Sequence, residues 1–348
     1  MAKVDEKQIR KRLGEAYAEA QRRPAMTRRL GDEKIVVFSD QHKGARDGAD
    51  DFQRCERSYN AALAYYHHMG WHLVLLGDVE ELWENSFEEV AEKYPRALEL
   101  EGRFHADGRY TRVFGNHDLV WSDAGRFQKA MKDSGVGDVT PVEAIRLTIQ
   151  GAGENGEDRE LFLTHGHQGT ADSDSLAWLS KIGVRAWRVA QNFINRPINQ
   201  PSMDWELRGE HSEAMMRWAE AEGRVLITGH THKPVFWNGE KKPEAVPGDV
   251  TPPEGVEDPQ EAEALRLAHV EWAEAEQERL KGDRPIQLPS PCYFNTGCCS
   301  FGDGDITGIE IDGGEIRLVR WPSHEKTRRQ ELEAMPLREV FAAVNPPG

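Results

Sequence analysis

Short apolar runs that end in polar residues recur along the chain. KIVVFSD at 34–40 and WHLVLLGD at 71–78 are rich in valine, isoleucine and leucine, and each run ends in an aspartate. A continuous apolar run of this length is typical of a buried strand. The stretch SYNAALAYYHHMG between them predicts a helix that ends at Gly70. The first part of the chain therefore alternates strands with helices.

Further strands follow with similar polar endings. After a helical stretch at about 86–105, YTRVFGNHD at 110–118 predicts a third strand, and RVLITGHTH at 224–232 predicts another. IRLTIQ and RELFLTHGH flank the turn-rich GAGENGED and predict a hairpin. CYFNTGC and DITGIEIDGGEIRLVRW predict closing strands, the second with a Gly-Gly turn. Strands that first alternate with helices and then pair with one another favour an α/β fold with mixed sheets.

Two long segments interrupt this pattern. Residues 172–208 carry three tryptophans with helical spacing, which fits either a packed helical hairpin or a cap over a site. Residues 238–290 are rich in proline, glutamate and alanine and predict a surface insertion. We interpret 1–348 as a single domain whose core comprises 30–236 and 291–322.

Composition narrows the range of partners. The chain is 38% hydrophobic and 30% charged, and its formal net charge of −16 opposes non-specific binding to nucleic acid or anionic membranes. Apolar stretches such as LVLL at 73–76 are far shorter than the roughly 20 residues that cross a bilayer, so we expect no transmembrane segment. The four cysteines form no CxxC pair, and the N-terminal residues lack the apolar core of a signal peptide. We therefore expect a cytoplasmic protein.

Five clusters of polar residues follow the predicted strands. The clusters are Asp40-Gln41-His42, Gly77-Asp78, Gly115-Asn116-His117-Asp118, His165-Gly166-His167 and Gly229-His230-Thr231-His232. Each cluster alone fits a solvated turn. Ligands in open α/β sheets gather beyond the carboxyl ends of parallel strands, so the clusters together predict one shared site. Their carboxylate, imidazole and amide groups suit manganese, iron or zinc better than calcium.

The order D-x-H, G-D-x-x-E, G-N-H-D, H-G-H and G-H-x-H resembles that of the calcineurin-like metallophosphoesterase superfamily. The resemblance covers roughly residues 34–236, and FNTGCCSFGDGDITGIEI at 294–311 resembles the closing strands of the family. It implies a four-layer αββα sandwich of two mixed β-sheets flanked by helices, with a helical cap insertion. It also implies hydrolysis of a phosphoester by a hydroxide that bridges two metal ions.

The resemblance further implies which residues bind two divalent or trivalent ions, with manganese expected and iron or zinc as alternatives. The implied ligands are, for the first ion, Asp40, His42 and His232; for the second, Asn116, His165 and His230; and, bridging both, Asp78. His117 is expected to face the substrate, where it stabilises the oxyanion or protonates the leaving oxygen, and Asp118 is expected to orient its ring. We expect His167 to orient a ligand and Asn295 to support the site.

One subgroup of the superfamily shows a closer likeness. GDVEELWEN, the tryptophan-rich segment after THGHQGTADSDS, and LITGHTHKPVF resemble the bacterial UDP-2,3-diacylglucosamine pyrophosphatases, whose helical cap shelters acyl chains. His117 departs from that subgroup, which has arginine at this position, and the insertion at 238–290 lies outside its pattern. Glu81 departs from the family more widely, because a second aspartate is common there.

These departures leave the substrate open. We expect a metal-dependent phosphoesterase that acts on a phosphomono-, phosphodi- or pyrophosphate ester, with a small phosphoester or a nucleotide sugar as substrate and peripheral lipid contact through the cap. The lipid-sugar pyrophosphatase is the specific alternative. A non-catalytic metal-binding scaffold is the alternative of another class, although such proteins tend to lose ligands that this chain retains. A nuclease is a third, with Lys43, Arg46 and Arg54 near the first loop as candidate contacts.

Overall fold

The computed structural model describes residues 5–48, 50–169, 205–236, 291–323 and 328–344. The described strands form two six-stranded sheets, and both sheets are mixed. The predicted surface insertion at 238–290 lies outside the described residues. The predicted cap at 172–208 lies outside them as well, except for its last four residues, which begin the helix α8 (Trp205–Ala221).

One sheet holds the first three predicted strands. Its strand order is β12-β11-β10-β2-β3-β4. The strands are β2 (Ile35–Phe38), β3 (His72–Leu76), β4 (Tyr110–Val113), β10 (Ile306–Asp312), β11 (Glu315–Trp321) and β12 (Gln330–Pro336). Strands β2, β3 and β4 are parallel, and β10 joins them in antiparallel register with Ile309 opposite Val37. The Gly-Gly turn predicted between the closing strands connects β10 and β11, and both glycines have positive φ.

The second sheet contains the predicted hairpin. Its strand order is β1-β5-β6-β7-β9-β8. The strands are β1 (Met26–Arg29), β5 (Ala144–Gln150), β6 (Arg159–Thr164), β7 (Val225–Thr228), β8 (Pro234–Val235) and β9 (Tyr293–Thr296). Strands β5 and β6 form the antiparallel hairpin, and β6, β7 and β9 run parallel to one another.

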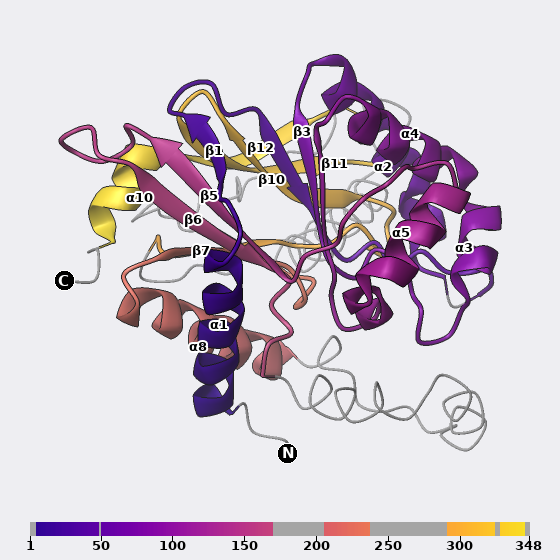
Figure 1. Ribbon diagram of the computed structural model, residues 1–348, viewed down its shortest axis with the longest axis horizontal. Helices are drawn as coiled ribbons and strands as arrows, with labels where there is room; N and C mark the ends of the chain where they lie inside the picture. The colour runs from indigo at the N-terminus through magenta and orange to yellow at the C-terminus, as the bar shows by residue number, and fades with distance from the viewer. Residues whose placement is uncertain (1–4, 49, 170–204, 237–290, 324–327, 345–348) are drawn as a thin grey trace, which may run out of the picture.

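Helices cover the outer faces of the two sheets, so the molecule has four layers (Figure 1). Helices α1 (Glu6–Gln21) and α8 contact the sheet that contains β5 and β7. The other sheet is covered by α2 (Phe52–His68) and α4 (Pro95–Ala106). The remaining described helices are α3 (Phe87–Lys93), η1 (Leu119–Ser122), α5 (Ala124–Asp133) and α10 (Leu337–Ala343). The expected αββα sandwich is confirmed.

Strand β2 shows why the sheets pack on both faces. Val36 and Phe38 belong to the core under α2, whereas Ile35 and Val37 belong to the core between the sheets. Successive side chains of a strand point to opposite faces, so a continuous apolar run buries both. The helical stretch expected at about 86–105 forms two helices. Proline has no backbone N–H to donate, and Pro95 therefore begins α4 rather than continuing α3.

Candidate metal centre

The predicted polar clusters lie at the carboxyl ends of strands from both sheets. Asp40 follows β2, Asp78 follows β3 and Asn116 follows β4. From the other sheet, His165 directly follows β6 and His230 follows β7. The side chains predicted to form one site thus converge at one end of the sandwich, across the junction of its two sheets.

The first group of candidate ligands contains Asp40, His42 and His232. Their ligand atoms lie within 4.8 Å of one another. His232 Nε2 is 3.3 Å from Asp40 Oδ1, and His42 Nε2 is 3.0 Å from His232 Nε2. His42 Nδ1 donates a hydrogen bond to Glu81 Oε2 at 3.1 Å, which directs its Nε2 toward the group. Nitrogen and oxygen atoms at these distances are stabilised by a proton or a metal cation between them.

The second group contains Asp78, His165 and His230. Their ligand atoms also lie within 4.8 Å of one another, and His165 Nε2 is 3.0 Å from Asp78 Oδ2. His165 Nδ1 donates to the carbonyl oxygen of Leu76 at 2.8 Å, which fixes Nε2 toward the site. Asp78 Oδ2 also lies 3.8 Å from His42 Nε2 in the first group. The Asp78 carboxylate therefore stands between the two groups.

Asn116 adds an oxygen that needs a partner. Its side chain is almost fully buried, and its Oδ1 accepts no hydrogen bond within the described residues. A buried polar atom without a partner costs free energy, and a cation would satisfy this one. The carboxylate, imidazole and amide donors of the two groups and of Asn116 suit a divalent transition metal. The residues present therefore fit the metal ions that the sequence implies.

The backbone at this site is strained. Among the described residues, seven residues other than glycine have positive φ, and five of them are predicted ligands. These five are Asp40, His42, Asp78, His230 and His232. Such conformations cost on the order of 1 kcal/mol or more each and persist where the surroundings enforce them. Glycines make the close approach possible, because a Cβ at Gly77 would lie 2.6 Å from the ring of His165.

Electrostatics keep the buried Asp78 carboxylate ionised. Burial raises the pKa of Asp78, but the positive charges of His165 and His117 outweigh it and hold that pKa well below the usual value. For His165, burial lowers the pKa, yet Asp78 and Asp40 raise it to about 9. The proton that His165 then carries occupies the place next to Asp78 that a cation would take. Burial and the charge of His165 lower the pKa of His230 and keep it neutral, as a metal ligand must be.

His117 is held by a different acid from the one expected. Its Nδ1 donates to Glu81 Oε2 at 2.6 Å, and its ring stacks on Trp83 with 3.8 Å between centroids and 19° between planes. Asp118 instead uses both carboxylate oxygens elsewhere: Oδ1 accepts from Gly115 N, and Oδ2 accepts from Val79 N and Arg112. The side chain that orients the His117 ring is therefore Glu81, at the position where the family commonly has a second aspartate.

Other side chains support the ligand loops. Asn295 Nδ2 donates to the carbonyl oxygen of Gly229 at 2.6 Å and so braces the loop of His230. The His167 ring lies 5.4 Å from that of His165, a candidate ligand. His211, in the middle of α8, was not foreseen: its Nε2 donates to Gly166 O at 2.9 Å, and its ring lies 5.5 Å from that of His230. The other histidines were found because they follow apolar strands, whereas His211 lies within a helix and has no such position in the sequence.

The basic residues that would have favoured a nuclease are engaged elsewhere. Lys43 is fully buried and bonds to Glu101. Arg46 pairs with Glu56, and Arg54 donates to the carbonyl oxygen of Gly302. These three residues therefore do not form a free cationic groove beside the site.

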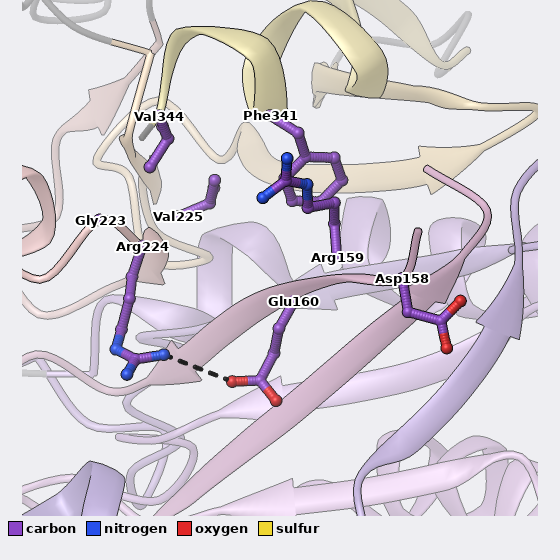
Figure 2. Close-up of a pocket in the computed structure, with 8 residues that line it drawn as sticks. All are labelled: Asp158, Arg159, Glu160, Gly223, Arg224, Val225, Phe341 and Val344. Atoms are coloured by element: carbon purple, nitrogen blue, oxygen red, sulfur yellow. Dashed lines mark ion pairs between the residues drawn. The ribbon is translucent and has the colours of Figure 1, made fainter. Parts of the chain in front are cut away.

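A cavity of about 150 Å³ lies at the opposite ends of β6 and β7 from the histidines (Figure 2). It is lined by Asp158, Arg159, Glu160, Gly223, Arg224, Val225, Phe341 and Val344. Arg224 and Glu160 form an ion pair of 3.9 Å in its wall. Because Arg159 and Val225 begin the strands that His165 and His230 follow, this cavity is separate from the metal centre.

Sequence comparison agrees with the geometry of the site. The sequence model described as calcineurin-like phosphoesterase matches residues 33–234. The chain belongs to the calcineurin-like phosphoesterase family, as its motifs predicted, and is a hydrolase of phosphoester bonds. The family and the candidate ligand groups together support binding of divalent metal. Among curated proteins, none matches this chain.

The solved structures that match this chain are distant from it. One is a conserved uncharacterized protein, described as a predicted phosphoesterase, from Streptococcus pneumoniae TIGR4, with 14% identity over 86% of this chain and 95% of that one and a TM-score of 0.32. Another is Vacuolar Protein Sorting 29 from Cryptosporidium parvum, with 13% identity over 88% of this chain and 99% of that one and a TM-score of 0.37. No described helix is long and apolar enough to cross a membrane.

Proposed function

We propose that the chain hydrolyses a phosphomono-, phosphodi- or pyrophosphate ester with the help of two metal ions. We expect manganese at both sites, with iron or zinc as the alternative ions. Asp40, His42 and His232 would hold one ion. Asn116, His165 and His230 would hold the other, and Asp78 would bridge them. The observation that carries this proposal is the position of Asp78 Oδ2, 3.0 Å from His165 Nε2 and 3.8 Å from His42 Nε2.

The metals supply two things when bound: a hydroxide formed from water, and positive charge against the phosphoryl oxygens. The protein contributes a pre-arranged set of donors around them. His117 has its Nδ1 held by Glu81, so its Nε2 remains to contact a phosphoryl oxygen or the leaving oxygen of the ester. The stacked indole of Trp83 restricts rotation of that ring.

The substrate within this class is proposed from chemistry alone. His117 can donate one hydrogen bond through Nε2, which an oxygen of any phosphoester could accept. The alternative is a UDP-2,3-diacylglucosamine-type pyrophosphatase, favoured by the GDVEELWEN motif, whose Trp83 forms one wall of the His117 site. The four cysteines are buried thiols, which suits a cytoplasmic location.

A hydrolysis assay tests the proposal. Protein loaded with Mn²⁺ is offered p-nitrophenyl phosphate, bis-p-nitrophenyl phosphate, nucleotide sugars, cyclic nucleotides and DNA. We expect turnover of at least one phosphoester, and Asp78→Asn to lower kcat/KM at least about 100-fold because it removes the shared ligand. Glu310→Gln, a buried acid on β10 bound to Arg329, is the matched control and should retain activity.

The result separates the alternatives. Preference for a nucleotide sugar over the aryl esters would favour the pyrophosphatase. If the metal-loaded protein hydrolyses none of these substrates, the proposal is rejected and a metal-binding scaffold is favoured.

A further inference from the structure

A cluster of charged side chains lies buried next to the metal centre. Its members are Lys43, Glu80, Glu101, Arg112 and Asp118, and each is essentially inaccessible to solvent. Removing charges from water is costly, and buried ion pairs can often be replaced by apolar residues of similar volume without loss of stability. Stability of the fold therefore does not by itself account for five buried charges in one place.

Glu80 is the centre of this network. Arg112 donates to both of its carboxylate oxygens, at 3.3 Å and 2.5 Å, and also to Asp118 Oδ2 at 2.8 Å. Trp121 Nε1 donates to Glu80 Oε2 at 3.0 Å. Lys43 Nζ lies 3.9 Å from Glu80 Oε1. Glu80 thus contacts two cations and one indole N–H.

Glu101, on α4, completes the network on the other side of Lys43. It accepts a hydrogen bond from Lys43 Nζ at 2.5 Å and from the hydroxyl of Tyr59 at 3.1 Å. Tyr110 donates to its second oxygen at 3.2 Å. The lysine is therefore fixed between the carboxylates of Glu80 and Glu101.

Three members of the network lie beside predicted metal ligands in the sequence. Lys43 directly follows His42, Glu80 lies two residues after Asp78, and Asp118 lies two residues after Asn116. Each of the three loops that leave β2, β3 and β4 thus carries at least one predicted ligand and one charged side chain of the network.

Backbone hydrogen bonds join the same loops. Lys43 N donates to Val79 O at 3.0 Å, and Glu81 N donates to Lys43 O at 3.0 Å. Val79 N donates to Asp118 Oδ2 at 3.0 Å. A displacement of one loop is therefore transmitted to the other two.

We propose that this buried network, centred on Glu80 and Arg112, positions the three ligand loops and so sets the affinity of the protein for its metals. Glu80 and Arg112 are positioning residues: they act through Lys43 and Asp118 on the loops. The inference rests on the proposed function, because the ligands that it positions are those assigned there. Its oppositely charged members hold the loops in one geometry, which apolar contacts would define less sharply.

Comparing two matched glutamates tests the inference. Glu80→Gln and Glu310→Gln each neutralise a fully buried, arginine-bound acid. Glu310, on β10, accepts from Arg329 just before β12 and from Tyr66 on α2, and among the described residues it bonds to no ligand loop. Binding of Mn²⁺ is measured by titration calorimetry, and the melting temperature is measured without metal. We expect Glu80→Gln to weaken Mn²⁺ binding at least about tenfold, whereas Glu310→Gln leaves it within twofold of the wild type.

A second pair of variants, with smaller changes, tests the inference if Glu80→Gln does not fold. Trp121→Phe removes the indole N–H that bonds to Glu80, and Trp321→Phe removes one that bonds to the hydroxyl of Tyr66. Weaker Mn²⁺ binding in Trp121→Phe alone supports the inference. Equal Mn²⁺ affinities in both matched pairs would overturn it while leaving the proposed function intact, provided that the wild type binds Mn²⁺ and hydrolyses an ester. Wild-type protein that binds no Mn²⁺ would overturn both.

Discussion

At the scale of single residues, Glu81 contacts two histidines for which different roles are predicted, His42 and His117. Its Oε2 accepts from Nδ1 of His42, a predicted ligand, and from Nδ1 of His117, which we expect to face the substrate. Burial raises the pKa of Glu81, but His117 and His42 lower it to about 2, so the carboxylate is ionised at neutral pH. One negative charge therefore fixes the orientation of both rings.

Replacing Glu81 by glutamine should reveal this double role. Glu81→Gln removes the charge but keeps the size, and we expect kcat to fall about 10- to 100-fold because the His117 ring is no longer held. Steady-state kinetics at saturating Mn²⁺ measures the change. Glu84→Gln, which alters an exposed acid three residues away, is the control and should behave as wild type. Retention of wild-type kcat in Glu81→Gln would contradict the assignment.

The sequence locates ligands better than it locates their partners. Asp40, Asp78 and His165 could be found because each stands at the end of an apolar strand. The sequence could not show that Glu81, rather than Asp118, bonds to the His117 ring, because this depends on the direction of each side chain. The Asp118 carboxylate points toward Gly115 N and Arg112, away from the His117 ring. No spacing rule conveys that direction.

At the scale of elements, continuous apolar strands were predictable and the polar edge strands β1 and β12 were not. Strands β2 and β3 are continuous apolar runs and were found, whereas β1 and β12 escaped the pattern. Both are edge strands of their sheets. Most residues of β12, QELEAMP, are exposed, so no hydrophobic alternation marks it.

A polar junction links edge strand β1 to the other sheet. Arg28 on β1 donates to His72 Nδ1 at 3.2 Å, and His72 Nε2 donates to Thr111 Oγ1 on β4 at 2.8 Å. The histidine must be neutral for Nδ1 to accept. Burial lowers its pKa to about 4, and the charges of Arg28 and Arg109 act in the same direction. This imidazole thus connects strands from both sheets while it stays unprotonated.

The junction predicts a specific acid sensitivity. Between the usual pKa of about 6.5 and the folded value of about 4, the unfolded chain binds a proton that the folded chain does not. The free energy of unfolding therefore falls as pH drops through that window, by up to about 3 kcal/mol. Urea unfolding of metal-free protein from pH 7 to 4 should show a shallower loss in His72→Gln. The exposed His68→Gln should keep the wild-type slope, and identical slopes in all three proteins would disprove the assignment.

At the scale of the whole molecule, the candidate ligands come from both sheets. Asp40, Asp78 and Asn116 follow strands of one sheet, whereas His165, His230 and His232 follow strands of the other. Bound cations would therefore join the sheets at one end, in addition to the apolar core between them. We propose on the same ground that the described elements act as one domain.

Removing metal should accordingly lower stability. A ligand present at 100 times its dissociation constant stabilises the folded state by about 2.7 kcal/mol, so saturating Mn²⁺ should raise the melting temperature by several degrees over protein treated with chelator. Differential scanning calorimetry measures the shift. Asp78→Asn, which lacks the shared carboxylate, should show little or none of it. If Mn²⁺ does not change the melting temperature of the wild type, this would argue against cations bound between the two sheets.

Helix α1 lies outside the residues that the family model matches, yet it is joined to the core of the molecule. Ile9, Leu13 and Ala16 are buried against the sheet that supplies His165. Gly169, four residues after that histidine, lies so near the backbone of Ile9 that a Cβ there would come within 2.6 Å of the Ile9 Cα. A fragment that begins at the boundary of the family match would lack α1 and its contacts with the loop that follows His165. Any shortened version of the gene should therefore retain the α1 segment.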